Sequence, residues 1–180
     1  MTFPIVALAD GEVADPQWFE DITDAVNDHE TRVDTLESQV ATSSESNTDP
    51  TTSRTTSSTT FTSTLSPANI CGTSFVAPTS GKVLVTWRCT LVNSGANYTA
   101  CSYSIASGST VGSGTTFQAA DDSRTVSTDS TTFEGQGASE YVSGLTPGAT
   151  YNVFLMHRTS NGASTATFLR RTVGVVPLIA

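Results

Sequence analysis

The spacing of apolar residues between positions 19 and 40 constrains this chain more than any other feature of its sequence. Apolar side chains recur there at intervals of three and four residues, and a histidine fills the one missing place. The residues of this seam are Phe19, Ile22, Val26, His29, Val33, Leu36 and Val40. Such spacing over three heptads is typical of a coiled coil, whose seam faces a partner helix. The spacing therefore predicts a helix that needs a partner.

We expect this helix to span residues 16–41. Asp15 is suited to capping the first free amides, and Pro16 loses no hydrogen bond at a first helical position. The helix would be about 39 Å long at about 1.5 Å per residue, and a lone helix of this size is marginal in water. Its partner is two further copies of the chain, one further copy, or the chain's own following domain.

The residues beside the seam bear on the number of copies. In the register that places Phe19 at heptad position a, Arg32 falls at g and Glu37 at e. Residues 32–37 then match Arg-h-x-x-h-Glu, where h is apolar, which resembles the trimerisation signature of short parallel three-stranded coils. That resemblance implies that Arg32 pairs with Glu37 of the next helix. We therefore expect a parallel homotrimer, with a dimer or intrachain packing as the alternatives.

His29 occupies a d position inside the predicted seam. One interpretation is an internal layer that binds an anion or responds to pH. The other is a polar layer that fixes the register and the oligomeric state at some cost in stability. We favour the second interpretation.

The segment before the helix, residues 1–15, is apolar without local cover. Its exposed side chains would form a cluster, to which the start of the helix adds one more residue. The members are Phe3, Ile5, Val6, Leu8 and Trp18. Such clusters usually mark partner sites, so we expect an arm that docks on a larger assembly. The alternative is an arm that folds back over its own coil.

The charge of the chain is unevenly distributed. Residues 1–50 hold twelve Asp or Glu and one Arg, whereas residues 51–180 hold five acidic and seven basic residues. An acidic segment argues against binding to nucleic acid, whose affinity depends on cation density. No run of apolar residues is long enough to cross a bilayer, and the start lacks the basic region of a signal peptide. We expect neither membrane insertion nor export by that route.

A run rich in serine and threonine follows the helix. Residues 42–64 contain 17 Ser or Thr out of 23 and cannot make a core. We expect a flexible connector over 42–53. From Arg54 onward the β-branched residues favour a strand. An O-glycosylated stalk is the competing interpretation, which the missing export signal disfavours.

The remainder, residues 54–180, has the pattern of an antiparallel β-sandwich. Short alternating strands are separated by turn residues, and the clearest strands are KVLVTWRCTLVN, YTACSYSIAS, ATYNVFLMHR and TFLRRTVGVVPL. The stretch GLTPGATYNV resembles the tyrosine corner of fibronectin type III domains. Trp87 lies far from Tyr151 for that fold, however, and the domain is large. We therefore expect a jelly roll of the trimeric, tumour-necrosis-factor-like kind, with a fibronectin type III-like sandwich as the alternative.

An arm, a short coil containing RVDTLE, a Ser/Thr connector and this β domain resemble the small fibre or spike proteins of tailed bacteriophages. The resemblance is notably to phages of GC-rich, actinobacterial hosts, and seven Arg against one Lys favour a GC-rich genome. The resemblance implies a homotrimeric virion protein, assembled in the host cytoplasm and placed on the virion surface. Its arm would bind other virion proteins in the capsid, portal or tail, and its head a host glycan or protein. A capsid decoration trimer or a carbohydrate-binding surface module are the alternatives.

Three cysteines, Cys71, Cys89 and Cys101, leave at least one unpaired, and none has metal or redox spacing. We expect small buried side chains. Cys89 and Cys101 lie symmetrically about the turn VNSGAN, so a disulfide across a hairpin is the alternative.

Catalytic chemistry is not indicated by the sequence. A Ser or Cys nucleophile needs a nearby base, and besides His29 the chain offers only His157, which we expect to be a satisfied strand histidine. A glycosidase pair would have to come from five acids in a turn-rich stretch. These are Asp121, Asp122, Asp129, Glu134 and Glu140. We interpret them as solvated loop carboxylates, with a calcium site as the alternative, and expect no enzyme and no cofactor.

Overall fold

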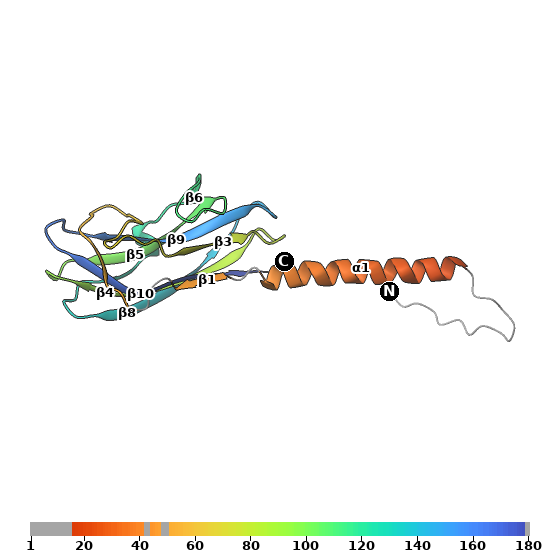
Figure 1. The fold of residues 1–180 in the computed structure, drawn as a ribbon, viewed down its shortest axis with the longest axis horizontal. Helices are drawn as coiled ribbons and strands as arrows, with labels where there is room; N and C mark the ends of the chain where they lie inside the picture. The colour runs from red at the N-terminus through yellow and green to blue at the C-terminus, as the bar shows by residue number, and fades with distance from the viewer. Residues whose placement is uncertain (1–15, 42–43, 48–50, 179–180) are drawn as a thin grey trace. The chain divides into compact units, whose positions relative to one another are not determined.

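The computed structural model describes residues 16–41, 44–47 and 51–178 (Figure 1). A boundary between two compact units falls after Ser38. Most of helix α1, Pro16–Ala41, belongs to the first unit, and its bounds coincide with the predicted helix. Within the described residues, no helix combines the length and apolar character needed to span a membrane.

The second unit, here called the β domain, is a sandwich of two five-stranded antiparallel sheets. Sheet A contains β1 (Ser44–Asn47), β2 (Arg54–Thr56), β4 (Val83–Asn93), β8 (Glu134–Val142) and β10 (Ala166–Pro177). Sheet B contains β3 (Gly72–Val76), β5 (Thr99–Ser107), β6 (Thr116–Gln118), β7 (Val126–Thr128) and β9 (Thr150–Thr159). A short 3-10 helix, η1 (Asp122–Arg124), precedes β7. The predicted class, a mainly β chain with an antiparallel sandwich, is confirmed.

The order of the strands shows how the chain winds between the sheets. Sheet A has the order β1-β10-β4-β8, with β2 also on β10, and sheet B has the order β3-β9-β5-β6, with β7 also on β5. The long strands β3, β4, β5, β8, β9 and β10 therefore alternate between the two sheets along the chain. Each sheet thus pairs strands that are distant in sequence.

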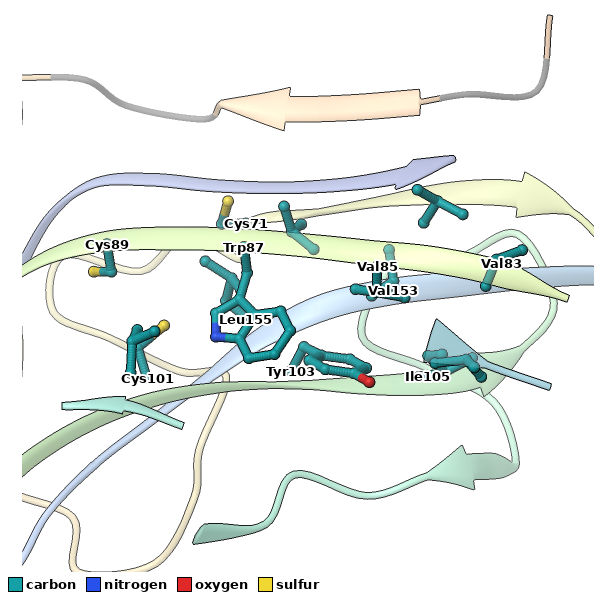
Figure 2. Close-up of a cluster of buried hydrophobic side chains, with 14 of the residues drawn as sticks. Cys71, Val83, Val85, Trp87, Cys89, Cys101, Tyr103, Ile105, Val153 and Leu155 are labelled. Atoms are coloured by element: carbon teal, nitrogen blue, oxygen red, sulfur yellow. The ribbon is translucent and has the colours of Figure 1, made fainter. Parts of the chain in front are cut away.

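The core lies between β4 and β5. Along β4, alternate side chains face inward, as the period-two pattern predicts, and these are Val83, Val85, Trp87, Cys89 and Leu91. From β5, Tyr103 packs on Trp87 with 4.8 Å between the ring centroids. Figure 2 shows these two rings side by side among the aliphatic side chains. The outer face of β5 is also buried, since the segment with η1 packs on it. The hydroxyl of Ser102 there donates to the carbonyl of Arg124 at 2.7 Å.

The predicted connector, residues 42–53, differs from the structure in one respect. Ser44–Asn47 forms β1, which pairs with β10 from Val175 back to Thr172. Strand pairing uses backbone groups, so a serine-rich segment can extend a sheet edge without contributing to the core. Arg54 begins β2, as the sequence predicts.

The sequence predicts a solvated loop for the turn-rich stretch that holds the five acids, residues 118–141, and this prediction is wrong for its second half. Residues Glu134–Val142 form β8, which pairs with β4 along its whole length. Its segment Gly135–Ser139 is exposed and composed of small or polar residues, so it lacks the apolar alternation that identifies a strand. Pairing with the strongly patterned β4 places it in the sheet.

The tyrosine corner predicted from GLTPGATYNV is present as a local structure. The backbone N–H of Thr146 donates to the hydroxyl of Tyr151 at 3.2 Å. Tyr151 is buried and stacks on Phe75, with 6.0 Å between ring centroids. The corner fixes the turn that leads into β9.

The three cysteines, Cys71, Cys89 and Cys101, are buried free thiols, as expected. The premise of the alternative disulfide is wrong, because β4 and β5 do not form a hairpin. Cys89 and Cys101 belong to different sheets and approach each other across the core, at one end of it (Figure 2).

Candidate functional site

The part of the helix α1 seam that the structure describes, Phe19 to Val33, is exposed in the single chain. The exposed fractions of its described apolar residues are 57% for Phe19, 42% for Ile22, 50% for Val26 and 40% for Val33. His29, in the same stripe, is also exposed. Uncovered apolar side chains at heptad spacing leave a stripe that a partner helix would bury.

Other predicted contacts of the arm and coil are only partly described. Arg32 Nη1 lies 4.0 Å from Asp28 Oδ2, and both side chains are more than two-thirds exposed. An exposed pair one turn apart contributes only a few tenths of a kcal/mol, so it does not oppose the predicted pairing with Glu37. The side chains of Trp18, Leu36, Glu37 and Val40, and the arm residues Phe3, Ile5, Val6 and Leu8, lie outside the described residues.

The outer face of sheet A carries a hollow, here called the arginine groove. Its volume is about 470 Å³. It is lined by Arg88, Cys89, Thr90, Gly135, Gln136, Gly137 and Arg170. Two guanidinium groups and one hydroxyl thus border a site whose lining contains no carboxylate. Such a wall has the chemistry to donate hydrogen bonds to an oxyanion.

A β-bulge in β10 directs Arg170 toward this groove. The pairing with β4 shifts between Leu169 and Thr172, so Arg170 and Arg171 together lie opposite Cys89. Arg171 enters the core with 1% of its surface exposed, while Arg170 is exposed at a φ of 49°. Because burial disfavours its charged form, the pKa of Arg171 is lowered. The bulge therefore separates two consecutive arginines onto opposite faces of the sheet.

Two glycines of β8 form the other side of the groove. At Gly137, an added Cβ would lie 3.2 Å from the Cβ of Arg88 and 3.3 Å from the carbonyl oxygen of Trp87. At Gly135, an added Cβ would meet only the Thr90 hydroxyl oxygen, at 4.0 Å. The glycine at 137 makes room for Arg88, and the glycine at 135 leaves the groove open.

A second hollow, of about 390 Å³, lies at the edge of the sandwich beside Trp87, Arg124 and Glu140. Here the Tyr103 hydroxyl donates to Glu140 Oε2 at 2.6 Å and accepts from the side-chain amide of Gln118 at 2.8 Å. Arg124 Nε lies 3.7 Å from the same carboxylate oxygen. Burial, reinforced by the hydrogen bond to Glu140, raises the pKa of Tyr103 well above its ordinary value. The hydrogen bond from Tyr103 to Glu140 ties the two sheets together, whereas Arg124 Nε has no hydrogen-bond partner among the described residues.

The five predicted acids do not gather into a site. Four of them contact protein partners: Asp121 accepts from Ser123 N, Asp122 pairs with Arg158, Glu134 accepts from Thr128, and Glu140 accepts from Tyr103. Hydrogen bonding to Ser123 lowers the pKa of Asp121. Asp129 is exposed. Among the residues that the structure describes, no three His, Cys, Asp or Glu side chains are placed to hold a metal ion.

His157 lies on β9, as predicted, but the expectation of a satisfied histidine is wrong, because neither of its ring nitrogens has a hydrogen-bond partner in the part of the chain that the structure describes. Its side chain is fully buried, and its ring packs edge-on against Phe168 with 4.6 Å between centroids. In the strand pairing it lies opposite Cys101 of β5. Since none of these groups contacts solvent, the structure brings His157 into the core and not into a cleft.

Sequence reasoning did not identify Arg88 and Arg170 as neighbours. They are far apart in sequence, and the bulge that exposes Arg170 has no glycine to mark its left-handed residue. Two signals were present: consecutive arginines within an apolar strand, and the alternation GQG in residues 135–137. Neither signal locates a groove until β8 is placed beside β4.

Comparison with known proteins yields no family. No family model matches the chain, and no curated protein matches it. Among solved structures, it is similar to the tandem CBM22-1-CBM22-2 domain of Paenibacillus barcinonensis Xyn10C, with 12% identity and a TM-score of 0.39, over 62% of this chain and 32% of that chain. It is also similar to the CBM22-1 xylan-binding domain of the same protein, with 12% identity and a TM-score of 0.38, over 76% of this chain and 95% of that one. The chain thus spans about a third of the tandem structure, and similarity at this level assigns it neither a family nor a ligand.

Proposed function

We propose that this chain is the subunit of a homotrimeric structural protein on the surface of a tailed-bacteriophage particle, without enzymatic activity. Residues 1–15 anchor it to other virion proteins, the coil of α1 joins three chains, and the β domain attaches the particle to the host surface. Three heads on one stalk give weak contacts the benefit of avidity. A capsid decoration protein with the same parts but no receptor role is the closest variant.

The observation that carries the proposal is the exposed stripe of α1. Phe19, Ile22, Val26 and Val33 remain 40–57% exposed in one chain, at the spacing of a coiled-coil seam. Burying an apolar side chain of this size stabilises an assembly by roughly 1.5–3 kcal/mol. A helix with such a stripe is stabilised by association, and the Arg32 to Glu37 pattern favours three strands.

The order of the strands supports a jelly roll for the β domain. In that architecture, two antiparallel sheets are built from chain segments that pass repeatedly from one sheet to the other. The alternation of β3, β4, β5, β8, β9 and β10 between sheets A and B follows this plan. A jelly roll suits a trimeric head of the tumour-necrosis-factor-like kind.

The oligomeric state tests the proposal directly. Sedimentation equilibrium of the full chain at micromolar concentration should give three times the mass of one chain. Val26→Asp places a charge in the seam and should shift the protein toward monomer. Asn27→Asp adds the same charge at the neighbouring b position and should remain trimeric. A monomeric wild type, or equal effects of the two substitutions, would reject the coil.

The place on the particle requires a separate measurement. Electron microscopy of phage particles that contain this chain, labelled with antibodies against the β domain, should show label on the outside of the capsid or tail. Label on capsid faces alone would support the decoration variant, and label at the tail the attachment role. Particles without label, although the chain is detected in the infected cell, would contradict a virion protein.

A further inference from the structure

We propose that the arginine groove is a binding site for an oxyanion, a carboxylate or phosphate group carried by a surface polymer. The inference deepens the proposed attachment role and rests on it for its biological meaning. It assigns a ligand class to the outer face of sheet A. The ligand is recognised by Arg88 and Arg170, with the hydroxyl of Thr90 as a further hydrogen-bonding group.

The first argument is uncompensated charge. Neither Arg88 nor Arg170 lies within 4.0 Å of a described carboxylate; the arginines in such ion pairs are at positions 32, 124 and 158. Arg88 Nε donates only a long hydrogen bond, 3.4 Å, to the hydroxyl of Thr172. Two guanidinium groups beside one hollow, with no acid in its lining, favour an anion there.

The second argument is backbone strain. Arg170 has a φ of 49°, a conformation that costs a residue with a side chain free energy relative to glycine. The bulge that imposes it is what turns Arg170 outward while Arg171 enters the core. Without the bulge, Arg170 and Arg171 would not both lie opposite Cys89, one facing outward and the other facing the core. The strain therefore serves to present a second cation at the groove.

The third argument is space. At Gly135 an added Cβ would meet no atom closer than 4.0 Å, and yet the residue is glycine within a paired strand. Glycine in a strand is otherwise unfavourable, because it packs nothing and loses much conformational entropy. The volume of about 470 Å³ is in the range of small-ligand sites, about 300–1,000 Å³. The missing side chain keeps the groove open for a ligand.

Two kinds of surface polymer supply the required group. Acidic polysaccharides carry carboxylates on uronic acids, and polyol-phosphate polymers carry phosphodiesters. Both present an oxyanion among hydroxyl groups, which suits a wall of guanidinium and hydroxyl groups. Sodium glucuronate and glycerol phosphate are therefore the probes for the two sources, with glucose as the uncharged control and inorganic phosphate as the bare anion.

The experiment is a titration of the full chain with each probe at low ionic strength. Binding is measured from the changes in the protein's NMR chemical shifts. We expect saturable shifts with glucuronate or glycerol phosphate, weakened by salt, and none with glucose. Whichever of the two binds more tightly identifies the source. Saturation by inorganic phosphate alone would show adventitious anion binding and would overturn the proposal, as would the absence of saturation with every probe.

Three variants locate the binding. Arg170→Gln removes one cation and should weaken the affinity about tenfold or more. Gly135→Val fills the groove without changing charge. An added Cβ there meets no atom closer than 4.0 Å and valine favours a strand, so the substitution should abolish binding while the thermal stability is kept. Lys82→Gln is the control. It removes the same charge from an exposed residue just before β4, about 20 Å from Arg88, and should change the affinity less than twofold.

These experiments test the proposed groove and the proposed trimer independently of each other. Binding by Gly135→Val equal to wild type, or an equal loss with Lys82→Gln, would overturn the assignment of the site. None of the three substitutions touches the seam of α1, so sedimentation still reports the coil. A trimer that binds no probe would reject the groove alone, and a monomer that binds would reject the coil alone.

Discussion

The hydroxyl of Tyr103 on β5 donates a 2.6 Å hydrogen bond to the carboxylate of Glu140 on β8 and thereby joins the two sheets of the sandwich. The bond closes the edge where β8 has no further neighbour in sheet A among the described strands. Tyr103 is fully buried, whereas the side chain of Glu140 is 32% exposed. A charge-assisted bond from the core thus anchors an edge strand that contributes few apolar contacts of its own.

Removing this hydroxyl should destabilise the β domain. Tyr103→Phe keeps the ring against Trp87 but leaves Glu140 without its donor, so we expect a loss of about 1–2 kcal/mol in the free energy of unfolding. Tyr141→Phe is the matched control, because Tyr141 is 54% exposed and should change stability by less than about 0.5 kcal/mol. Urea denaturation of the two variants measures the difference; equal stabilities would show that the bond is not important.

Stability should also fall in alkali. The folded protein raises the pKa of Tyr103 above that of an unfolded tyrosine, about 10. The corresponding stabilisation is therefore fully present below pH 10 and is lost as the pH rises toward the folded pKa. Urea midpoints at pH 8, 10 and 11 should fall more steeply for wild type than for Tyr103→Phe. Parallel pH profiles would contradict the shift.

The strands of the core were predictable from the sequence, and the edges of the sheets were not. β4 alternates apolar and polar residues over eleven positions, so its inward face could be assigned correctly from the amino-acid pattern alone. β8 has no such alternation, since its pairing depends on β4 and on the bond to Glu140. β1 likewise forms by adding backbone hydrogen bonds to β10. A strand that forms mainly through pairing with a neighbouring strand therefore has little of the alternating pattern by which a strand is predicted from sequence.

The arginine groove could not be predicted for a different reason. Its two cations come from β4 and β10, and their proximity depends on the order of the strands and on a bulge at Arg170. Local pattern reasoning assigns residues to faces only where the period of two is regular. The bulge interrupts that period, so the outward position of Arg170 follows only from the observed pairing with β4.

The thiols should be inaccessible in the folded protein. Cys71, Cys89 and Cys101 are buried, and burial raises the pKa of the Cys101 thiol, which disfavours the reactive thiolate. We expect almost no reaction of the native protein with a thiol reagent such as DTNB at pH 8 within minutes. Unfolding in guanidinium without reductant should expose three thiols. One thiol instead of three would demonstrate a disulfide.

Two glycines with positive φ should respond differently to alanine. At Gly148, φ is 74° and an added Cβ meets nothing within 4 Å, so Gly148→Ala should cost only the backbone strain, about 1–2 kcal/mol. At Gly114, φ is 105° and the Cβ would lie 1.9 Å from the carbonyl oxygen of Ser107. Gly114→Ala should therefore cost more than about 3 kcal/mol. The thermal unfolding of both variants measures the two losses of stability. A larger loss for Gly114→Ala than for Gly148→Ala would show that the steric clash adds to the backbone strain.

If the chain forms the proposed trimer, the histidine in its seam should limit the stability of the assembly. His29 takes a d position between apolar layers, and His29→Leu adds an apolar side chain there, which should stabilise the assembly by about 2 kcal/mol per chain. The melting temperature of α1, followed by circular dichroism at 222 nm, should rise and should depend on protein concentration. Thr31→Leu places the same side chain on the opposite face of the helix and should raise it little. If both substitutions acted alike, intrinsic helix propensity and not a buried seam would explain the gain, and the polar layer assigned to His29 would have to be abandoned.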